Sequence, residues 1–461
     1  MYKIIIENSG AVYEANDGEL LSELLIRYGE MFEHPCSGKG ICKKCTLTVD
    51  GESVLSCQYK IKSDIVVELP EKEAIATADA GKETGRVTKN MCLCLDIGTT
   101  TLHLALVSAD EGAIVKSLVH NNPQRALGAD VMSRIEYASR NGVYKLQRVL
   151  IDEVNQMIDE TGEKVTTLYV AGNTTMLHTF FGIDPSDMGQ APYTPVFLDK
   201  KRMSGEDAGI RNVREVISLP NISAFVGADI TAGLNFAEMP CKGKYNFLID
   251  LGTNAEVVLY GNDKLYCTAA AAGPCFEGVN ISSGMSATEG AIYSYTGNMC
   301  LIIGGGRAKG ICATGLIDAI AVMLEEEIID ETGFMEEDFE IKDSVKLTQG
   351  DIRQFQLAKS SIYSAVIALL KKAGIDFCDI DKVFVSGGFS SEMNLGNAIR
   401  AGLLPEEVRG RFYSVNNSCL GGLVKYACEK NDLDMFLKNA EYVDLASDKN
   451  FQELFIENMM F

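Results

Sequence analysis

The chain has 461 residues, a hydrophobic fraction of 46% and a formal net charge of −22 at pH 7. This length predicts two or more domains, and the strong negative charge excludes nucleic acid and anionic membrane surfaces as expected partners. No run of 18 apolar residues occurs, and the opening MYKIIIENSG predicts a short strand, not a signal peptide. We therefore expect a cytoplasmic protein in which most of the 14 cysteines are reduced, small hydrophobic residues; four others are treated below.

Residues 1–72 predict a small α+β domain. Two strands are followed by an amphipathic helix, a cysteine-bearing loop and three further strands. This order of elements is typical of a β-grasp ferredoxin. The segments that predict the elements are 2–8, 11–15, 19–29, 34–45, 46–51, 52–57 and 64–70.

Four cysteines in this region, Cys36, Cys42, Cys45 and Cys57, have the spacing C-x5-C-x2-C-x11-C. Three lie in one loop and the fourth ends a strand, and soft thiolates in this arrangement suit a [2Fe–2S] cluster. The plant-type spacing has one residue fewer in the first gap, so the pattern resembles the adrenodoxin-like branch. The alternatives are no metal, or a structural zinc site. Zinc typically needs two close cysteine pairs, and only one occurs here.

Residues 73–91 are small and charged, with no hydrophobic periodicity, and predict a linker. A linker of this length spans at most about 60 Å when extended. We therefore expect the small domain to swing relative to the rest of the chain.

Two later segments, 91–107 and 244–260, share one design. In each, an apolar run ends in an acid, Asp96 or Asp250, and a tight polar turn leads into a second apolar run. Such a turn brings N–H groups and hydroxyls close to a phosphate, and its acid is placed to hold Mg²⁺ or a water bound to it. Asp-x-Gly-Thr also forms ordinary turns, but two copies are an internal repeat and predict a duplicated fold. The turn residues are Gly98, Thr99, Thr100, Thr101, Gly252, Thr253 and Asn254.

A third apolar run ends in the pair Gly387–Gly388, and paired glycines after a strand let a base or ribose approach the backbone. Two acid hairpins and a glycine pair, in this order, resemble the actin/Hsp70/sugar-kinase (ASKHA) ATPase superfamily over residues 92–461. The resemblance implies a duplicated, ribonuclease H-like α/β ATPase fold that binds ATP and Mg²⁺ between two lobes. Lobe I is expected at 92–245, and lobe II, with a C-terminal segment, at 246–461.

Two further acids are candidate catalytic residues. Asp130 begins a predicted helix, with Arg134 one turn later; the two either form a local ion pair at the helix start or face the γ-phosphate in the cleft. Asp229 follows a predicted strand that ends at Gly227, and it either lies in the cleft or caps the next helix. His178, on an apolar helix, is expected to be a packed core residue.

The stretch 269–292 is rich in glycine and serine and includes Ser282 and Ser283. A flexible loop of small residues is costly in the core half of an enzyme unless something approaches it. We interpret it as a partner- or substrate-facing loop, with an ordinary connection as the alternative. Further on, glycines precede a helix that starts near Gly315, and in this superfamily a helix at this place lies against the adenosine.

A ferredoxin domain joined to an ASKHA ATPase resembles the reductive activators of corrinoid proteins along the whole chain. The family uses ATP to rescue cobalamin-dependent methyltransferases whose cobalt has been oxidised to Co(II). The resemblance implies that a low-potential donor reduces the cluster and that the electron passes to a corrinoid protein and restores Co(I). We expect the loop that contains Ser282 and Ser283 to face the corrinoid, and the resemblance does not fix which serine lies closest to it. Segments that carry the resemblance are CSGKGICKKC, LDIGTTT, LGADVMSRI, VAGNTTM, VGADI, IDLGTNAE, GPCFEGVNISSGM, GICATGLID and VSGGF.

Two features depart from the family pattern. Lys43 stands where the family often has glycine, and the sequence lacks the small domain that longer members carry between the ferredoxin and ATPase parts. Partner contacts are therefore expected to differ. The sequence names neither the partner nor the donor, and it leaves the oligomeric state open, with a homodimer as one option.

Three other functions fit parts of the sequence. A small-molecule kinase with a ferredoxin sensor domain needs a general base near its acceptor hydroxyl, for which Asp130 or Asp229 is available. An activator of another low-potential metalloenzyme is a second alternative; among these, the activators of radical dehydratases resemble the ATPase part but have no fused [2Fe–2S] domain. The intact Asp96, Asp250 and glycine pair disfavour a plain electron-transfer module with a degenerate ATPase lobe.

Overall fold

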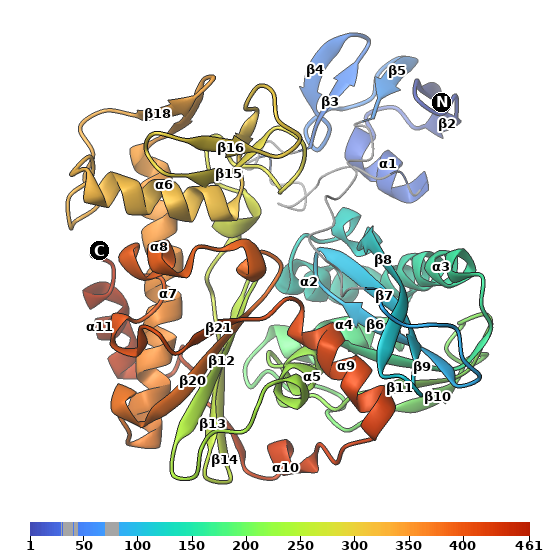
Figure 1. Cartoon of the computed structure of the whole chain (residues 1–461). Helices are drawn as coiled ribbons and strands as arrows, with labels where there is room; N and C mark the ends of the chain where they lie inside the picture. Colours follow the sequence, from blue (N-terminus) through green and yellow to red (C-terminus); the bar gives the residue numbers. More distant parts are fainter. Residues whose placement is uncertain (29, 31–39, 41–44, 70–82) are drawn as a thin grey trace.

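Figure 1 shows a small N-terminal unit beside two larger α/β lobes. Two predicted cluster ligands, Cys36 and Cys42, and residues 73–82 of the predicted linker lie outside the described part of the chain. The residues that the computed structural model describes are 1–28, 30, 40, 45–69 and 83–461.

Alternating apolar residues build the N-terminal sheet. In β1 (Tyr2–Ile6), Ile4 and Ile6 are buried while Ile5 is exposed, because successive side chains in a strand point to opposite faces. Three leucines of α1 pack on the buried face, and the strand order is β2-β1-β5-β3-β4, with β1 and β5 parallel. The predicted order of elements is confirmed. The other elements are β2 (Val12–Ala15), α1 (Leu21–Tyr28), β3 (Thr46–Val49), β4 (Glu52–Leu55) and β5 (Ile65–Glu68).

The first lobe is built on a six-stranded sheet in the order β10-β11-β9-β6-β7-β8. An antiparallel meander of β6, β7 and β8 comes first, then β9 adds parallel to β6 and β11 parallel to β9. The hairpin predicted at 91–107 is confirmed as β6 and β7. The strands are β6 (Met91–Ile97), β7 (Thr101–Ser108), β8 (Ala113–Asn121), β9 (Val165–Gly172), β10 (Arg202–Ser204) and β11 (Val213–Ser218).

The second lobe repeats this topology in the order β21-β20-β12-β13-β14-β22. Here β12, β13 and β14 form the meander, β20 adds parallel to β12, and β21 adds parallel to β20. The predicted duplication is confirmed, and Asp96 and Asp250 occupy equivalent places near the ends of the two central strands. The strands are β12 (Tyr245–Leu251), β13 (Ala255–Gly261), β14 (Lys264–Ala270), β20 (Ile380–Ser386), β21 (Phe412–Ser414) and β22 (Ala440–Tyr442).

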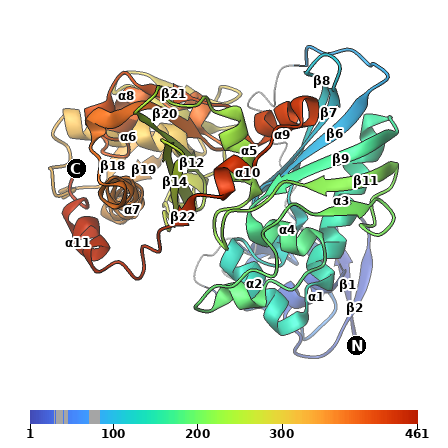
Figure 2. The same cartoon turned by 90° about the horizontal axis from the view of Figure 1, so that it is seen from below.

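Two helices, α5 (Ala228–Phe236) and α9 (Ser418–Glu429), pack against one another between the lobes (Figure 2). Glycine permits their close approach, because a Cβ at Gly422 would lie 1.8 Å from the carbonyl oxygen of Ala232. Side chains of α9, Leu423 among them, belong to the same hydrophobic core as the sheet of lobe I. Helix α9 is therefore an exception to the predicted division of the lobes near residue 245.

Of the remaining helices, α3 and α4 pack on the sheet of lobe I and α7 packs on the sheet of lobe II, whereas α6 packs on the small strand β15 and on α8, and α11 packs on α7. No helix in the described part of the chain is both long and apolar enough to cross a membrane. The helices are α2 (Val131–Asn141), α3 (Tyr144–Thr161), α4 (Thr174–Phe180), α6 (Ala313–Glu325), α7 (Gln349–Ala373), α8 (Leu395–Arg400), α10 (Asp434–Leu437) and α11 (Lys449–Glu457). The small strands are β15 (Ala291–Tyr295), β16 (Cys300–Ile302), β17 (Gly310–Ile311), β18 (Phe339–Lys342) and β19 (Val345–Leu347).

The C-terminal segment packs back on α7. The ring of Phe461 stacks on Phe355 of α7 at 6.1 Å, and Gln356 Nε2 donates to the carbonyl oxygen of Met459 at 2.9 Å. The chain end thus completes the core of lobe II on the face of α7 that the sheet leaves uncovered.

The end of the predicted linker that the structure describes is hydrogen-bonded to β8. Thr84 N and Gly85 N donate to the carbonyl oxygen of Ile114 at 3.0 and 2.9 Å, and Ser117 N donates to Glu83 Oε1 at 2.9 Å. Residues 83–85 therefore follow the edge of the first lobe's sheet.

Candidate functional site

Four acids from the two lobes face one another between the sheets. Burial raises the pKa of Asp229 to about 7, and the charges of Asp250 and Asp96 add to the shift. Burial and the charge of Asp96 raise the pKa of Asp250 to about 6, against a hydrogen bond from Ser386 that lowers it. Burial raises the pKa of Glu256 well above its ordinary value, and the charges of Asp229 and Asp250 add to the shift. The structure thus brings together Asp96, Asp229 and Asp250, three of the predicted catalytic acids.

The acid cluster suits a divalent cation. In the described part of the chain, no lysine or arginine is among the groups that shift the pKa of Asp229, Asp250 or Glu256, so a bound cation would supply the missing positive charge. No three side chains of His, Cys, Asp and Glu in this part of the chain lie close enough to hold a metal by themselves. Mg²⁺ needs no such cage, because it keeps several waters and takes phosphate oxygens beside one or two carboxylates.

The N-terminal end of α9 joins the central acids of both lobes. Asn417 Nδ2 donates to Asp96 Oδ2 at 3.0 Å and lies 3.0 Å from His103 Nδ1. Burial lowers the pKa of His103 even though Asp96 raises it, so the ring is neutral and accepts. Ser418 Oγ lies 2.7 Å from the hydroxyl of Ser386, which bonds to Asp250. The positive end of a helix dipole therefore points at the acids.

A buried arginine fixes the turn that follows Asp96. The side chain of Arg134 is completely buried; its Nη2 donates to the carbonyl oxygen of Thr99 at 2.5 Å and its Nε to that of Gly128 at 2.8 Å. Burial lowers the pKa of this guanidinium to about 9. Asn122 Nδ2 holds the carbonyl oxygen of Gly98 from the other side, at 2.8 Å. Side chains of lobe I therefore fix the carbonyls of Gly98 and Thr99.

Asp130 and Asp229 have different local roles. Asp130 caps α2, since Ser133 N donates to its Oδ1 at 2.7 Å, and its part in catalysis stays a prediction. The N-cap of α5 is Gly227, so Asp229 is not the capping residue; it lies in the first turn, where its Oδ1 accepts from Ile230 N at 2.9 Å and so still satisfies one N–H of the helix start. The strand predicted before Gly227 is wrong, because β11 ends at Ser218 and a loop follows.

The predicted nucleoside-binding glycines have separate explanations. Gly387 has a φ of 116°, and a Cβ there would lie 2.1 Å from the carbonyl oxygen of Leu251, so only glycine fits beside β12. Gly388 faces open space within 4 Å, as a ligand-facing glycine should. At Gly315 a Cβ would lie 2.3 Å from the carbonyl oxygen of Ile292. The packing of α6 on β15 therefore explains this glycine, and its nucleotide contact stays a prediction.

The two phosphate turns meet at Glu277, in the 3₁₀ turn Pro274–Glu277. Thr100 Oγ1 donates to Glu277 Oε1 at 3.2 Å, and Thr253 Oγ1 donates to the same oxygen. Thr100 belongs to lobe I and Thr253 to lobe II. One carboxylate oxygen thus accepts hydrogen bonds from both predicted phosphate-binding turns.

Both predicted partner-facing serines make hydrogen bonds within lobe II. Ser282 is exposed, yet its N–H and hydroxyl donate to Asp351 Oδ1 at 2.7 and 3.2 Å. Ser283 Oγ accepts from Lys346 N at 3.1 Å. The nearby Gly278 and Gly284 face each other so closely that a Cβ on either would overlap the other's backbone region. The small residues thus fold the loop on itself, and its contact with a corrinoid stays a prediction.

Of the predicted cluster ligands, Cys45 and Cys57 are described, and each is 1% exposed. They flank the strands β3 and β4, which pair antiparallel with Thr46 opposite Leu55, and Ser56 N donates to the carbonyl oxygen of Cys45 at 3.0 Å. This register places both thiols at one end of a hairpin. The described half of the donor set therefore fits a thiolate-bound cluster.

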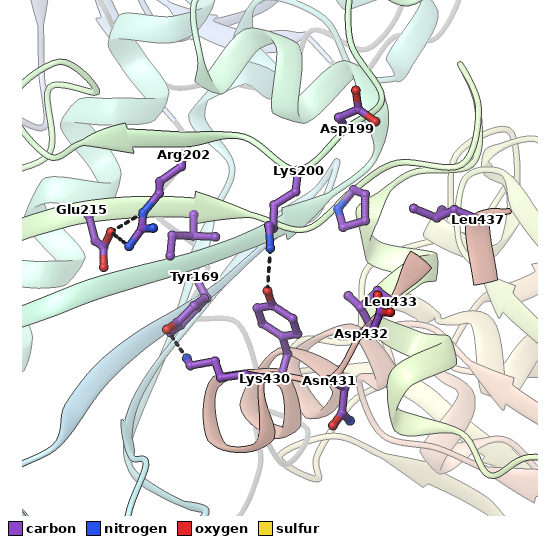
Figure 3. A pocket seen from close by; sticks show the side chains of 13 residues that line it. Tyr169, Asp199, Lys200, Arg202, Glu215, Lys430, Asn431, Asp432, Leu433 and Leu437 are labelled. Carbon is purple, nitrogen blue, oxygen red and sulfur yellow. Dashed lines mark hydrogen bonds and ion pairs between the residues drawn. The ribbon is translucent and has the colours of Figure 1, made fainter. Parts of the chain in front are cut away.

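A cavity of about 590 Å³ lies apart from the acids, near the C-terminal end of α9 (Figure 3). Lys200 Nζ donates to the hydroxyl of Tyr426 at 3.3 Å, and Lys430 lies 3.9 Å from the ring centroid of Tyr169. None of the predicted site residues that the structure describes lines this cavity. The lysines and tyrosines that line this cavity contact one another. We therefore do not include the cavity in the site between the lobes.

Sequence reasoning missed Glu256 and Asn417. In the second hairpin, Asp250 pairs with Glu256, the second residue of the otherwise apolar strand β13. A charged residue at such a position could have identified Glu256 from the sequence. No comparable signal marks Asn417, which approaches Asp96 only through the packing of α9. His178 is confirmed as a core residue: it is fully buried and stacks on Phe197 at 4.5 Å.

The duplicated sheets, the paired hairpins and the facing acids define a protein of the ASKHA class. A family model described as the C-terminal domain of RACo, the ASKHA domain, matches residues 244–461. A second model, described as the RACo middle region, matches residues 91–242.

Individual relatives agree with these matches. The chain is 30% identical over 418 residues to the corrinoid activation enzyme RamQ of Eubacterium limosum, covering 80% of this chain and 70% of that protein. It is 24% identical over 422 residues to the [Co(II) methylated amine-specific corrinoid protein] reductase of Methanosarcina barkeri, covering 79% and 76%. A solved structure of a reductive activator for corrinoid, iron–sulfur protein superposes with a TM-score of 0.72 at 26% identity, covering 100% and 98%. The chain belongs to the RACo family.

Proposed function

We propose that this chain is an ATP-dependent reductive activator, which passes an electron from a [2Fe–2S] cluster to an inactive Co(II) corrinoid protein of a methyltransferase system and so restores Co(I). The observation that carries the proposal is the acid cluster between duplicated hairpins in a chain of the RACo family. Its relatives are named for corrinoid activation, for reduction of a Co(II) corrinoid protein, and for activation of a corrinoid, iron–sulfur protein.

The site between the lobes binds MgATP. Asp96 and Asp250 hold the cation or its waters, the turns Gly98–Thr101 and Gly252–Asn254 donate to the phosphates, and Gly388 faces the nucleoside. Bound MgATP supplies the free energy of the cycle. Asp229, whose pKa is about 7, takes the proton of the attacking water, since a general base works best when its pKa lies near the working pH.

The N-terminal domain carries the electron. Cys36, Cys42, Cys45 and Cys57 would hold the [2Fe–2S] cluster, which would supply one-electron chemistry between a low-potential donor and the corrinoid partner. The burial of Cys45 and Cys57 keeps water from these two ligands and shields the thiolates from oxidation.

ATP is needed because the electron transfer runs uphill. Plant-type [2Fe–2S] centres have potentials near −400 mV, and reduction of Co(II) to Co(I) in a corrinoid requires a lower one still. Each difference of about 59 mV by which the transfer is uphill lowers the equilibrium constant of the one-electron transfer tenfold. A change in the angle between the lobes can favour a docked state in which cobalt loses an axial ligand, which raises its potential. Alternatively, methylation traps Co(I).

The decisive experiment reconstitutes the reaction. Anaerobic protein with an intact cluster is mixed with a Co(II) corrinoid protein, a low-potential reductant and MgATP, and the absorption of Co(I) is followed. Co(I) should form with ATP and not with ADP. Equal formation with both nucleotides, or none with any corrinoid partner while a small-molecule hydroxyl is phosphorylated, would assign the chain to another activity.

A further inference from the structure

The carboxylate of Glu277 lies where two hydroxyls from different lobes converge. Thr100 donates to Glu277 Oε1 from the turn after β6, and Thr253 donates to the same oxygen from the turn after β12. Both turns stand in equivalent places of a duplicated fold. The acceptor that these hydroxyls share therefore lies at the interface between the two lobes.

The backbone of Glu277 is anchored in lobe II. The preceding Cys275 and Phe276 are 2% and 5% exposed, and the ring of Phe276 lies 5.3 Å from that of Phe389, directly after the glycine pair, and 5.9 Å from that of Phe355 in α7. The hydrophobic core thus sets the position of Glu277. Its side chain is half-buried and reaches from this anchor to the hydroxyl of the other lobe.

A carboxylate oxygen and a phosphate oxygen can each accept hydrogen bonds from these hydroxyls. Both are anionic acceptors that bind O–H donors, and two anions cannot share the donors without strong repulsion in a partly buried site. A nucleotide whose last phosphate reaches both turns must therefore displace the carboxylate of Glu277. A nucleotide one phosphate shorter leaves the shared position to Glu277.

We propose that Glu277 occupies the position of the terminal phosphate of a nucleoside triphosphate, and that this phosphate takes the hydroxyls of Thr100 and Thr253 from it. Glu277 is a positioning residue in this account: without nucleotide its carboxylate joins the two turns, and the triphosphate must displace it on binding. The inference rests on the proposed ATP site and adds to it the residue that distinguishes triphosphate from diphosphate.

Calorimetric titration of the full-length protein tests the proposal. A non-hydrolysable MgATP analogue and MgADP are titrated into the wild type, Glu277→Gln and Glu277→Ala, with Glu289→Gln, an exposed acid in the same stretch, as the matched control. Removal of the competing charge should lower the Kd of the ATP analogue about tenfold and that of ADP by less than about threefold. Glu289→Gln should leave both Kd values unchanged.

Hydrogen exchange in the wild type gives a second readout that does not depend on the folding of a variant. The ATP analogue should speed exchange around residues 274–278, and ADP should not. Unchanged ATP affinity in folded Glu277 variants, or equal gains for ATP and ADP, would overturn the inference. Loss of hydrolysis in Glu277→Gln with no gain in affinity would instead make Glu277 a catalytic base. If the wild type binds no nucleotide, the proposed ATP site fails, and this inference fails with it.

Discussion

Asn417 donates from its side-chain amide to Asp96 at 3.0 Å, although 321 residues separate the two along the chain. Asn417 has a left-handed backbone, with a φ of 40°, and caps α9 by accepting from Leu420 N at 2.8 Å. The central acid of lobe I is therefore held by a segment that follows most of lobe II. A change in the angle between the lobes must act on this hydrogen bond, and α9 is the element that would transmit it.

The first prediction concerns Asp250. Asp250→Asn keeps the shape of the side chain but removes one of the charges proposed to hold magnesium, so ATP hydrolysis should fall by at least about 100-fold. The visible absorption of the cluster should not change, because the N-terminal sheet is a separate unit. Asp263→Asn, an exposed acid in the next turn of the same sheet, is the control. Hydrolysis at the native rate in Asp250→Asn would reject the assignment of the hairpins.

The second prediction concerns pH and magnesium. The pKa values of Asp229 and Asp250 are about 7 and about 6, above the value of 3.8 that these groups have in the unfolded chain. Between pH 3.8 and these values, the folded state therefore binds more protons than the unfolded state. These two groups therefore stabilise the fold most below pH about 4, and this contribution is lost as pH rises through 6 to 7. Above that range the charges repel one another unless a cation joins them.

Magnesium should thus raise the melting temperature strongly at pH 8 and little at pH 5. Thermal unfolding at pH 5, 6, 7 and 8, with and without MgCl₂, measures this difference, and Asp250→Asn should reduce the shift at pH 8. A magnesium-induced shift of equal size at every pH would show that the cation binds somewhere other than at these acids.

Much of the fold and part of the site follow from local pattern. The strand–acid–turn repeat predicts both hairpins, because apolar runs around Gly98 and Gly252 leave few other pairings, and the order of elements predicts the small N-terminal sheet. The pairing of Glu256 with Asp250 was accessible from the hairpin register. Asn417 was not, since nothing local in residues 416–418 encodes contact with a strand that precedes them by more than 300 residues.

The errors have a common physical origin in packing. The stretch before Gly227 is apolar and reads as a strand, but tertiary packing makes it a loop that leads into α5. Packing also explains Gly315, whose missing side chain makes room for the carbonyl oxygen of Ile292, while its nucleotide contact stays a prediction. Helix α9 follows lobe II in sequence yet buries its apolar face against the sheet of lobe I. Contacts between elements distant in sequence decided each of these cases.

The third prediction concerns the cysteines. Cys57→Ala should lose the [2Fe–2S] cluster, because it removes one of four proposed ligands, whereas Cys94→Ala should keep it, because Cys94 is fully buried in β6 of lobe I. Iron analysis and EPR of reduced, anaerobically purified protein measure the outcome: two irons and an S = ½ signal in wild type and Cys94→Ala, and neither in Cys57→Ala. Stoichiometric zinc without iron in the wild type would reject the cluster.

The fourth prediction concerns Ser282 and Ser283, which we propose face the corrinoid. The double variant Ser282→Val/Ser283→Val should activate a Co(II) corrinoid partner about tenfold less well while basal ATP hydrolysis is retained, because neither serine contacts the acid cluster. Small hydroxyls suit this position because they let a large macrocycle approach and offer only a weak, replaceable oxygen neighbour to cobalt.

The contacts of these serines within lobe II require a matched design. Ser282 donates to the buried Asp351, and Ser283 accepts from Lys346 N, so valine at these positions also removes structural hydrogen bonds. Asp351→Asn weakens the same contact of Ser282 without altering the exposed surface, and Ser286→Val changes an exposed residue of the same loop. If Asp351→Asn lowers activation as much as the double variant at equal melting temperature, or if the double variant activates its partner normally, the serines serve the folding of the loop, and the corrinoid must dock on another surface, with the N-terminal sheet as the next to test.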